Sequence, residues 1–209
     1  MRAEFCQFLA CPVCGAELKI SHAASMDGDE VAEGELQCTS SHLFPITKGF
    51  PRFVSKENYA SNFGFQWNMF RRTQLDSYSG HPISGNRFWA QSGWKREELA
   101  GKRVLDVGCG AGRFAEIALE AGAQVVALDY SVAVEACCEN HREKFPHSLN
   151  VVQGDIYHLP FRPGQFDFVY CFGVLQHTPD VRAAFLALPR QHAAGGRLAV
   201  DIYRKHWSN

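Results

Sequence analysis

The segment VLDVGCGAG (residues 104–112) combines residue types that could hold a ligand: an aspartate, Asp106, and then three alternating glycines, Gly108, Gly110 and Gly112. Glycine costs backbone entropy and packs no side chain, so three in five residues indicate that something approaches the backbone closely. An apolar run before them and RFAEIALEAG after them suit a phosphate, a dinucleotide or another adenosine cofactor. A P-loop needs a lysine that is absent here, and the third glycine of a dinucleotide fingerprint would fall on Arg113, so both fit poorly.

A second group, near the N-terminus, has the spacing of metal ligands. Cys11 and Cys14 form a CxxC followed by glycine, and Cys38 and His42 lie four residues apart further on. The pattern matches a Cys3His zinc site, whose four protein ligands leave no open position and make it structural. A module of about fifty residues buries little core and needs such a metal.

Other interpretations of this group stay open. The knuckle could be reduced and metal-free with His42 at the surface, or the fourth ligand could be Cys6 or His22. Residues 21–35 read as a polar loop between the two halves of the pattern. The remaining cysteines lie in apolar or helical contexts and are expected to be ordinary buried residues: Cys109, Cys137, Cys138 and Cys171.

The composition fits a folded chain with no strong charge preference. The 209 residues are 46% hydrophobic and carry a formal net charge of −1, which gives no global argument for nucleic-acid binding. No apolar run approaches the length of a membrane span, and the N-terminus lacks the features of a secretory signal. We therefore expect a cytoplasmic protein with no membrane partner.

The elements that must position the glycine loop alternate from residue 102 onward. Predicted strands and helices follow one another, which predicts a parallel sheet with helices on both faces and ligands outside the carboxyl ends of the strands. The strands are RVLDV, QVVALD, NVVQGD, FDFVYCF and GGRLAVDIY, and the helices are RFAEIALEAG, SVAVEACCENHREKF and VRAAFLALPRQH, the last broken or ended near Pro189.

Four successive motifs carry a resemblance to a known family. In order, VLDVGCGAGRFA, VVALDYS, VVQGDIYHLPF and FDFVYCFGVLQHTPD resemble the motifs of the class I S-adenosylmethionine-dependent methyltransferases, over about residues 100–203. The stretch CPVCGAEL … LQCTSSHLFPITKGFPRFV, about residues 5–54, resembles the small zinc-ribbon domain fused to, or partnering, methyltransferases. The resemblance implies a Rossmann-like α/β fold preceded by a zinc ribbon, with S-adenosylmethionine and a structural Zn²⁺ as cofactors.

The resemblance also implies a cofactor site. Asp129 would accept from the ribose hydroxyls, Asp155 from the adenine amine with Ile156 donating its N–H, and Phe172 with Gly173 would lie beside the methyl group. The alternative is that the aspartates merely cap the turns after them. The predicted cofactor-binding residues are Asp106, Gly108, Cys109, Gly110, Gly112, Asp129, Tyr130, Ser131, Asp155, Ile156, Phe172 and Gly173.

His177, in LQHTPD, is the candidate catalytic residue. Its ordinary pKa range suits a general base, and in the family a histidine here usually helps to shape the pocket. The strand-four motif differs from the Asn/Asp-Pro-Pro-aromatic pattern of enzymes that methylate exocyclic amines of bases. Methyl transfer needs little protein chemistry beyond alignment, so a base matters only if the acceptor must lose a proton early.

The middle segment is dense in aromatic residues. Phe63, Trp67 and Phe70 have helical spacing, and they could pack on the next domain, roof a ligand pocket, or do both. GHPISGN reads as a turn or loop, and RFWAQSGWKREELAG as a helix ended by Gly101. The predicted division is therefore a zinc ribbon over 1–54, an aromatic helical linker or lid over 55–100, and a methyltransferase domain over 101–209.

The sequence leaves three possible functions open. A small-molecule acceptor fits the neutral charge and aromatic entrance. The alternative acceptor is ribosomal or transfer RNA, because a ribbon ahead of such a domain is similar to the large-subunit rRNA guanine-N1 methyltransferases, in which the ribbon helps to grip RNA. A non-catalytic scaffold is the third. The family sheet normally has seven strands and this sequence stops just past the fifth, at RKHWSN, so we expect either a fragment or a minimal fold. The uncovered edge would tend to pair with something, which leaves the oligomeric state open.

Overall fold

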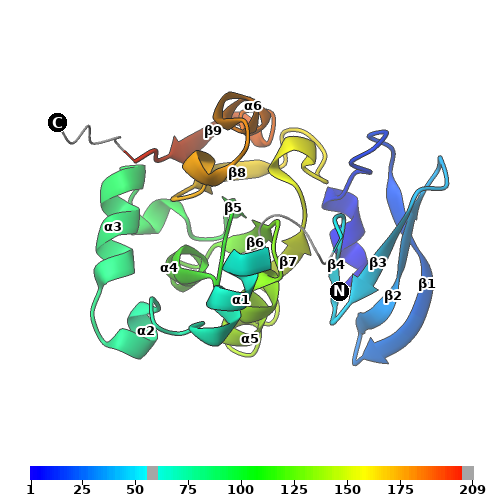
Figure 1. Cartoon of the computed structure of the whole chain (residues 1–209), viewed down its shortest axis with the longest axis horizontal. Coiled ribbons are helices and arrows are strands. Elements are labelled where there is room, and N and C mark those ends of the chain that lie inside the picture. The colour runs from blue at the N-terminus through cyan, green and yellow to red at the C-terminus, as the bar shows by residue number, and fades with distance from the viewer. Residues whose placement is uncertain (56–60, 204–209) are drawn as a thin grey trace.

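The computed structural model describes residues 1–55 and 61–203, with only the backbone described for Ser61, Asn62, Phe63 and Phe65. Two sheets lie side by side, a four-stranded antiparallel sheet near the N-terminus and a five-stranded parallel sheet (Figure 1). Among the described helices, none has the length and apolar character needed to cross a membrane.

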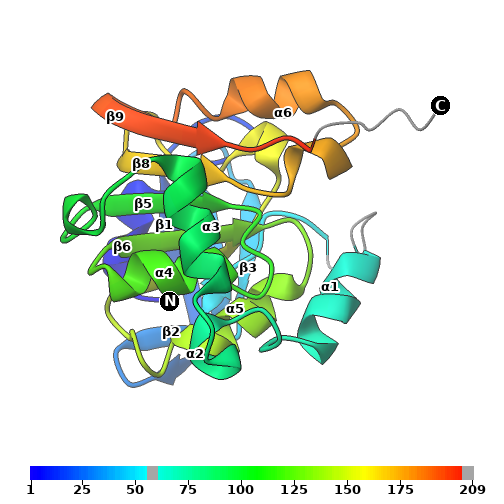
Figure 2. The ribbon, with the colours of Figure 1, turned by 90° about the vertical axis from the view of Figure 1, so that its left-hand side faces the viewer.

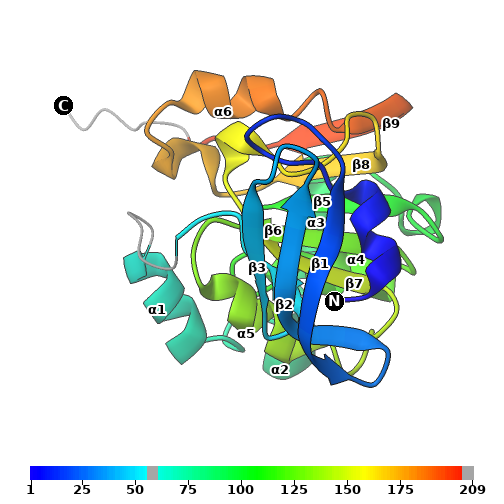
Figure 3. The ribbon, with the colours of Figure 1, turned by 90° about the vertical axis from the view of Figure 1, so that its right-hand side faces the viewer.

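The N-terminal ribbon (residues 1–54) is built on the antiparallel sheet. A 3-10 helix, η1 (Ala3–Phe8), precedes it, and its strands run in the order β1-β2-β3-β4. Figure 3 shows this sheet lying across the rest of the molecule. The strands are β1 (Leu18–Asp27), β2 (Glu30–Cys38), β3 (Leu43–Thr47) and β4 (Phe50–Pro51).

The prediction of a loop over residues 21–35 is wrong, because these residues form most of the β1–β2 hairpin. Gly28, with φ +59°, makes its turn, and Asp27 pairs with Glu30. Beyond Ile20 the side chains of β1 are all exposed, so the strand has no alternation of apolar and polar residues. That alternation is the signal by which a sequence predicts a strand.

The middle segment forms three short helices, α1 (Ser61–Met69), α2 (Asp76–Ser79) and α3 (Ile83–Ser92), and a 3-10 turn, η2 (Arg96–Glu98). Two predictions are wrong here. The expected loop GHPISGN contains the first turn of α3, and α3 ends at Gly93, in the left-handed conformation at φ 65°, rather than at Gly101. Pro82 before the helix and Gly93 after it are common helix boundaries.

The parallel sheet confirms the predicted fold class. Its strand order is β7-β6-β5-β8-β9. The first of these strands in the chain, β5, is therefore central; β6 and β7 follow on one side of it, and β8 and β9 on the other. The strands are β5 (Arg103–Val107), β6 (Gln124–Asp129), β7 (Leu149–Gln153), β8 (Phe166–Cys171) and β9 (His192–Val200). The helices are α4 (Arg113–Glu120), α5 (Ala133–His141) and α6 (Val181–Ala187), with 3-10 turns η3 (Ile156–His158) and η4 (Leu175–His177).

The two faces of the parallel sheet are covered differently. On one face, α3 and α4 pack over the sheet, as Figure 2 shows, around buried residues such as Phe88, Trp94 and Val104. On the other face, Leu105 and Leu128 share a core with Ala184 of α6 and with the ribbon. The aromatic residues Phe88 and Trp94 of the middle segment therefore belong to the core.

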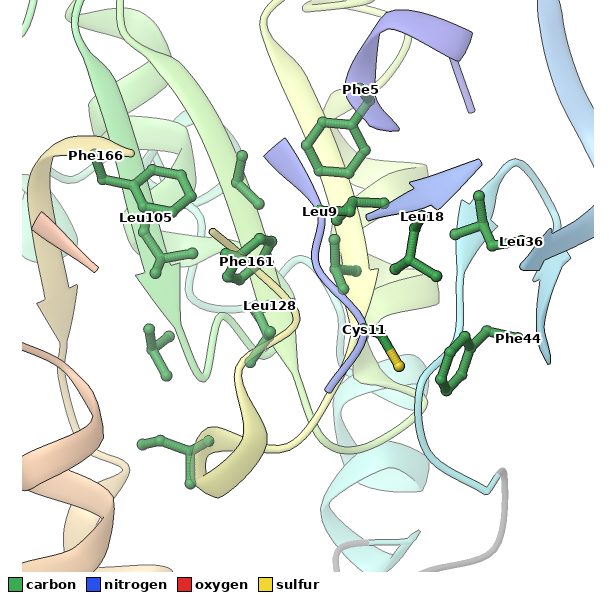
Figure 4. Close-up of a cluster of buried hydrophobic side chains, with 14 of the residues drawn as sticks. Phe5, Leu9, Cys11, Leu18, Leu36, Phe44, Leu105, Leu128, Phe161 and Phe166 are labelled. Atoms are coloured by element: carbon green, nitrogen blue, oxygen red, sulfur yellow. The ribbon is translucent and has the colours of Figure 1, made fainter. Parts of the chain in front are cut away.

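The ribbon packs directly on this second face of the parallel sheet. Phe5, Leu9 and Leu36 of the ribbon lie in one continuous cluster with Leu105 and Leu128 of the sheet (Figure 4). Of the two buried clusters in the described residues, the one on this face thus runs from the ribbon into the parallel sheet. The ribbon and the parallel sheet each bury apolar surface against the other, which stabilises both parts.

Polar contacts join the two parts along the edge strand β7. The Phe53 amide donates to the Gln153 carbonyl at 2.8 Å, and Arg52 pairs with Gln153 in parallel fashion. The Arg52 guanidinium donates to Gln153 Oε1 at 2.7 Å and to Glu135 Oε1 at 2.8 Å. The ribbon therefore covers the edge at β7 that the sheet would otherwise expose.

Candidate functional site

The structure brings the four predicted zinc ligands together. The ligand atoms of Cys11, Cys14, Cys38 and His42 all lie within 4.8 Å of one another. Cys14 Sγ lies 3.8 Å from Cys38 Sγ, and Cys38 Sγ lies 3.3 Å from His42 Nδ1. Tetrahedral zinc holds sulfur and nitrogen ligands about 3.5–3.8 Å apart, so this set fits the ion.

Two turns of the ribbon produce this cluster. Cys11 and Cys14 flank a turn closed by the Gly15 amide, which donates to the Cys11 carbonyl at 2.8 Å. Hydrogen bonds to its sulfur, first from the Ala16 amide and then from the Ser40 hydroxyl, lower the pKa of Cys14 to about 6. A thiolate is the form that binds metal. The alternative ligands lie elsewhere, Cys6 in η1 and His22 exposed on β1.

A cavity of about 290 Å³ lies at the carboxyl ends of the parallel strands. This is the edge at which open α/β sheets bind ligands. Ten of the twelve predicted cofactor residues line it: Gly108, Cys109, Gly110, Asp129, Tyr130, Ser131, Asp155, Ile156, Phe172 and Gly173. The predicted catalytic residue, His177, lines it as well.

Asp129, at the end of β6, lines the cavity and accepts a hydrogen bond from the glycine loop. Its Oδ2 accepts from the Gly110 amide at 2.9 Å, and its Oδ1 accepts from the Ser131 amide and hydroxyl, each at 2.8 Å. Burial raises the pKa of Asp129, and the hydrogen bonds from Ser131 and Gly110 oppose that shift. Each oxygen can accept a further hydrogen bond, so the carboxylate can also bind hydroxyl groups.

Asp155 caps a turn, as the alternative prediction has it, and it also lines the cavity. Its Oδ1 accepts from the Tyr157 amide at 2.9 Å and begins η3. The next residue, Ile156, also lines the cavity. Because Asp129 ends β6 and Asp155 follows the adjacent β7, the two acids lie on the same side of the central strand β5.

Two predicted residues do not reach the cavity. Asp106 points into the core under α3 and α4, where it is 2% exposed; burial raises its pKa to about 8, the nearby Tyr170 hydroxyl opposes the shift and the Asp129 charge adds to it. A Cβ at Gly112 would lie 2.7 Å from the His141 ring, so this glycine permits packing against α5 rather than approach of a ligand. The Gly112 carbonyl accepts from His141 Nε2 at 3.0 Å.

Contacts within the protein also explain why Gly108 and Gly110 are glycines. Gly108 has φ +85°, and a Cβ there would lie 2.2 Å from the Val174 side chain. A Cβ at Gly110 would lie 3.3 Å from the Trp67 indole, which lines the cavity from α1. Of the three predicted ring positions, Trp67 lines the cavity, Phe70 is exposed, and the side chain of Phe63 is outside the described part of the chain.

The sequence analysis missed the residues at the opposite end of the cavity. Arg87 comes from α3, Arg113 begins α4, and Tyr203 follows β9. Arg87 and Tyr203 lie beside Gly173, and Arg113 neighbours Arg87, since both guanidinium groups lie over the Phe114 ring. Arg113 directly follows the glycine loop, a position that could have drawn attention to it, whereas no motif marks Arg87 or Tyr203.

The parallel sheet order, the glycine loop and the acids at two neighbouring strand ends define a class I S-adenosylmethionine-dependent methyltransferase fold. Two family comparisons agree with this class. Residues 105–200 match the family described as methyltransferase domain, and residues 3–49 match the family described as Trm112p-like protein. The chain belongs to the class I methyltransferases and carries an N-terminal Trm112p-like zinc-ribbon domain.

Curated relatives place the chain in the same group. It is 30% identical over 162 residues to a ubiquinone biosynthesis O-methyltransferase of Xanthomonas euvesicatoria, covering 69% of this chain and 66% of that protein. A protein of the same description from Pseudomonas aeruginosa is 34% identical over 113 residues, 54% of this chain and 49% of its own length. The chain thus spans about half to two thirds of these relatives.

Two solved structures share the fold. A protein of Methanococcus maripaludis described as an S-adenosyl-L-methionine-dependent methyltransferase matches with a TM-score of 0.55 at 20% identity, over 70% of this chain and 65% of its own. Magnesium protoporphyrin IX methyltransferase of Synechocystis, solved with its cofactor bound, matches with a TM-score of 0.51 at 21% identity, over 66% and 73%. At these identities the likeness concerns the fold.

Proposed function

We propose that this protein transfers a methyl group from S-adenosylmethionine to a small-molecule acceptor. The observation that carries the proposal is the cavity at the carboxyl ends of the strands, because it gathers ten residues assigned to the cofactor from sequence motifs alone. The named activity of the curated relatives, O-methylation in ubiquinone biosynthesis, supports the same reaction type and a small organic acceptor.

The residues present fit this cofactor. Asp129 and Asp155 offer carboxylate oxygens on the β6 and β7 side, which suits ribose hydroxyls and an adenine amine. Gly108 and Gly110 leave the backbone open at the centre, and Phe172 and Gly173 would border the reacting methyl group. When bound, S-adenosylmethionine supplies a methyl group already activated by its sulfonium.

The protein's part in this reaction is to orient the reactants and exclude water. Trp67 closes the cavity over Gly110, which suits a lid that shields the cofactor. We propose that His177 contacts the acceptor, shaping its subsite and accepting a proton where the acceptor carries one. The proposed domain division keeps the sequence boundaries: a structural ribbon over 1–54, a lid and linker over 55–100, and a catalytic domain over 101–209.

The ribbon is proposed to hold a structural Zn²⁺ through Cys11, Cys14, Cys38 and His42. The three cysteine ligands must stay reduced to bind metal, which suits a reducing compartment, and we propose that the protein acts in the cytoplasm. The ribbon gives little support to the RNA alternative, because the outer strands and their turn expose the acids Asp27, Asp29 and Glu33. RNA-binding surfaces instead carry clustered basic residues.

Calorimetric titration with S-adenosylmethionine and S-adenosylhomocysteine tests the proposal. We expect micromolar binding that Asp129→Ala weakens about a hundredfold, since it removes the carboxylate that also holds the loop. Asp180→Ala is the matched control, because Asp180 caps α6 through the Ala183 amide and lies outside the cavity. A folded protein that binds neither compound would refute the methyltransferase proposal, and a salt-dependent shift with bulk RNA would favour an RNA acceptor instead.

A further inference from the structure

Helix α1 packs against α5 beside the cavity, and a glycine permits the close approach (Figure 2). Gly64 is buried, and a Cβ there would lie 2.7 Å from the Val132 side chain and 3.1 Å from the Val132 amide nitrogen. A glycine inside a helix destabilises that helix, so this contact explains its place in α1. The packing brings Trp67 of α1 over Gly110 at the cavity wall.

Polar contacts also hold α1 and the residues after it against α5. Asn68 Nδ2 donates to the Val132 carbonyl, just before α5, at 3.0 Å. Arg71, two residues beyond α1, pairs with Glu139 of α5 at 2.6 Å, and the two side chains are 37% and 52% exposed. An ion pair so exposed to water contributes little to the docking of α1.

Asn140, near the end of α5, joins the segment after α1 to the glycine loop. Its Nδ2 donates to the Arg71 carbonyl and to the Ala111 carbonyl, each at 2.9 Å. A side-chain amide nitrogen carries two hydrogens, so both are used here. Both acceptors are carbonyl oxygens, which fixes the orientation of the amide because its own oxygen would repel them. Ala111 belongs to the glycine loop and lines the cavity.

Two successive residues of α5 therefore hold two successive carbonyls of the glycine loop. Asn140 binds the Ala111 carbonyl, and His141 donates through Nε2 to the Gly112 carbonyl at 3.0 Å. Asn140 adds to this support a link to the segment that follows α1. It lies outside the four motifs from which the cofactor site was predicted.

We propose that Asn140 is a positioning residue for the cofactor, which ties the segment after α1 to the glycine loop so that Trp67 and the loop close on the ligand together. The inference rests on the proposed function and deepens it. One amide bonded to both sides of the cavity makes their positions interdependent. A side that loosens releases the ligand sooner, so the effect falls on the dissociation rate more than on the association rate.

Calorimetric titration and stopped-flow kinetics of S-adenosylhomocysteine binding test this role. Asn140→Ala leaves the Arg71 and Ala111 carbonyls without this donor. We expect binding about tenfold weaker, with most of the change in the dissociation rate. Asn140→Asp keeps the volume of the side chain but replaces the donor by an acceptor, so it should weaken binding at least as much.

A double-mutant cycle with Trp67 separates positioning from a purely structural role. Trp67→Ala removes the ring that α1 places over Gly110 and should by itself weaken S-adenosylhomocysteine about tenfold. If Asn140 acts through α1, adding Asn140→Ala to Trp67→Ala should weaken binding by less than about twofold more, because the ring that it positions is gone. A full tenfold loss in the Trp67→Ala background would overturn the link to α1.

Two further variants are the matched controls. Asn86→Ala removes an exposed asparagine of α3 outside the cavity and should leave the affinity unchanged. Glu139→Gln breaks the exposed pair with Arg71 at the same junction and should change the affinity by less than about twofold. The assignment to Asn140 is wrong if Glu139→Gln loses as much affinity as Asn140→Ala, or if Asn140→Ala binds as the unsubstituted protein does.

Hydrogen exchange of the free protein tests the same link without a ligand. In Asn140→Ala the amides of α1 should exchange about tenfold faster, whereas those of the central strand β5 should exchange as before. Unchanged exchange in α1, or faster exchange in β5 as well, would overturn the positioning role. Failure of the proposed function is distinct, because the unsubstituted protein would then bind no S-adenosylhomocysteine while the exchange of α1 still reports on Asn140.

Discussion

The ribbon and the parallel sheet position their chemical groups by different means. In the ribbon, two turns separated by more than twenty residues meet at Cys11, Cys14, Cys38 and His42, and the hairpin between them is largely exposed. In the parallel sheet, buried strands bring Asp129 and Asp155 to one edge because parallel neighbours end together. The first site is thus set by two turns at the base of an exposed hairpin, whereas the second is set by buried parallel strands.

The two regions are nevertheless coupled. Phe5, Leu9 and Leu36 of the ribbon occupy the core on the second face of the sheet, together with Leu105 and Leu128. A ribbon that lost its metal would therefore uncover the sheet on which the cofactor cavity is built. Removing the metal therefore tests whether the parallel sheet depends on the ribbon.

The largest effect is expected from removing the metal. Chelation, or Cys38→Ser, should lower the melting temperature by more than about 10 °C, because structural zinc sites contribute several kcal/mol to folding and the shared core opens with the ribbon. Differential scanning calorimetry with zinc quantification checks this. Cys6→Ser, a cysteine outside the ligand set, is the control. An unchanged melting temperature without zinc would mean that the ribbon stands without metal.

A smaller effect concerns the buried acid of the sheet. The folded-state pKa of Asp106 is about 8 and its reference value is 3.8, so between these values the folded form keeps a proton that the unfolded form releases. This group therefore makes stability fall as pH rises, by about 1 kcal/mol per pH unit. Asp106→Asn cannot ionise and should lose that slope.

Urea unfolding at pH 5 and pH 8 measures this difference between the two proteins. Asp167→Asn is the control, since Asp167 lies near the other end of the same strands and is partly exposed. An Asp106→Asn variant with the slope of the unsubstituted protein would show that Asp106 is ionised in the fold.

The smallest effect tests the polar contact between the two regions. Gln153 accepts from Arg52 and donates through Nε2 to the Tyr130 carbonyl at 3.1 Å, beside the cavity. Gln153→Glu still accepts from Arg52 but cannot donate to Tyr130, so we expect S-adenosylhomocysteine to bind about threefold to tenfold more weakly. Titration calorimetry checks the affinity.

Arg142→Gln provides the comparison for this contact. Arg142 pairs with Glu30 across the same interface and does not contact Gln153. It should lower stability with little change in affinity. Equal losses of affinity in both variants would mean that the interface acts only through overall stability.

The ends of the parallel strands were predictable, because short apolar runs that alternate with helices indicate one topology, a parallel sheet. RVLDV and QVVALD match β5 and β6 residue for residue. The hairpin over residues 21–35 was mispredicted because an exposed strand has no apolar alternation. The end of α3 was mispredicted because Gly93 and Gly101 can both end a helix by residue type. The expectation about the chain's end, RKHWSN, concerns residues 204–209, which lie outside the described part.

The sequence by itself determined ten of the residues that line the cavity and the four that cluster in the ribbon, because strand order and knuckle spacing are local patterns with few structural solutions. Only the tertiary structure decided that Asp106 and Gly112 face inward, that the ribbon shares the core of the sheet, and that Arg87 and Arg113 meet. Those outcomes depend on which faces of distant elements pack together, and packing between distant elements leaves no periodicity in the sequence.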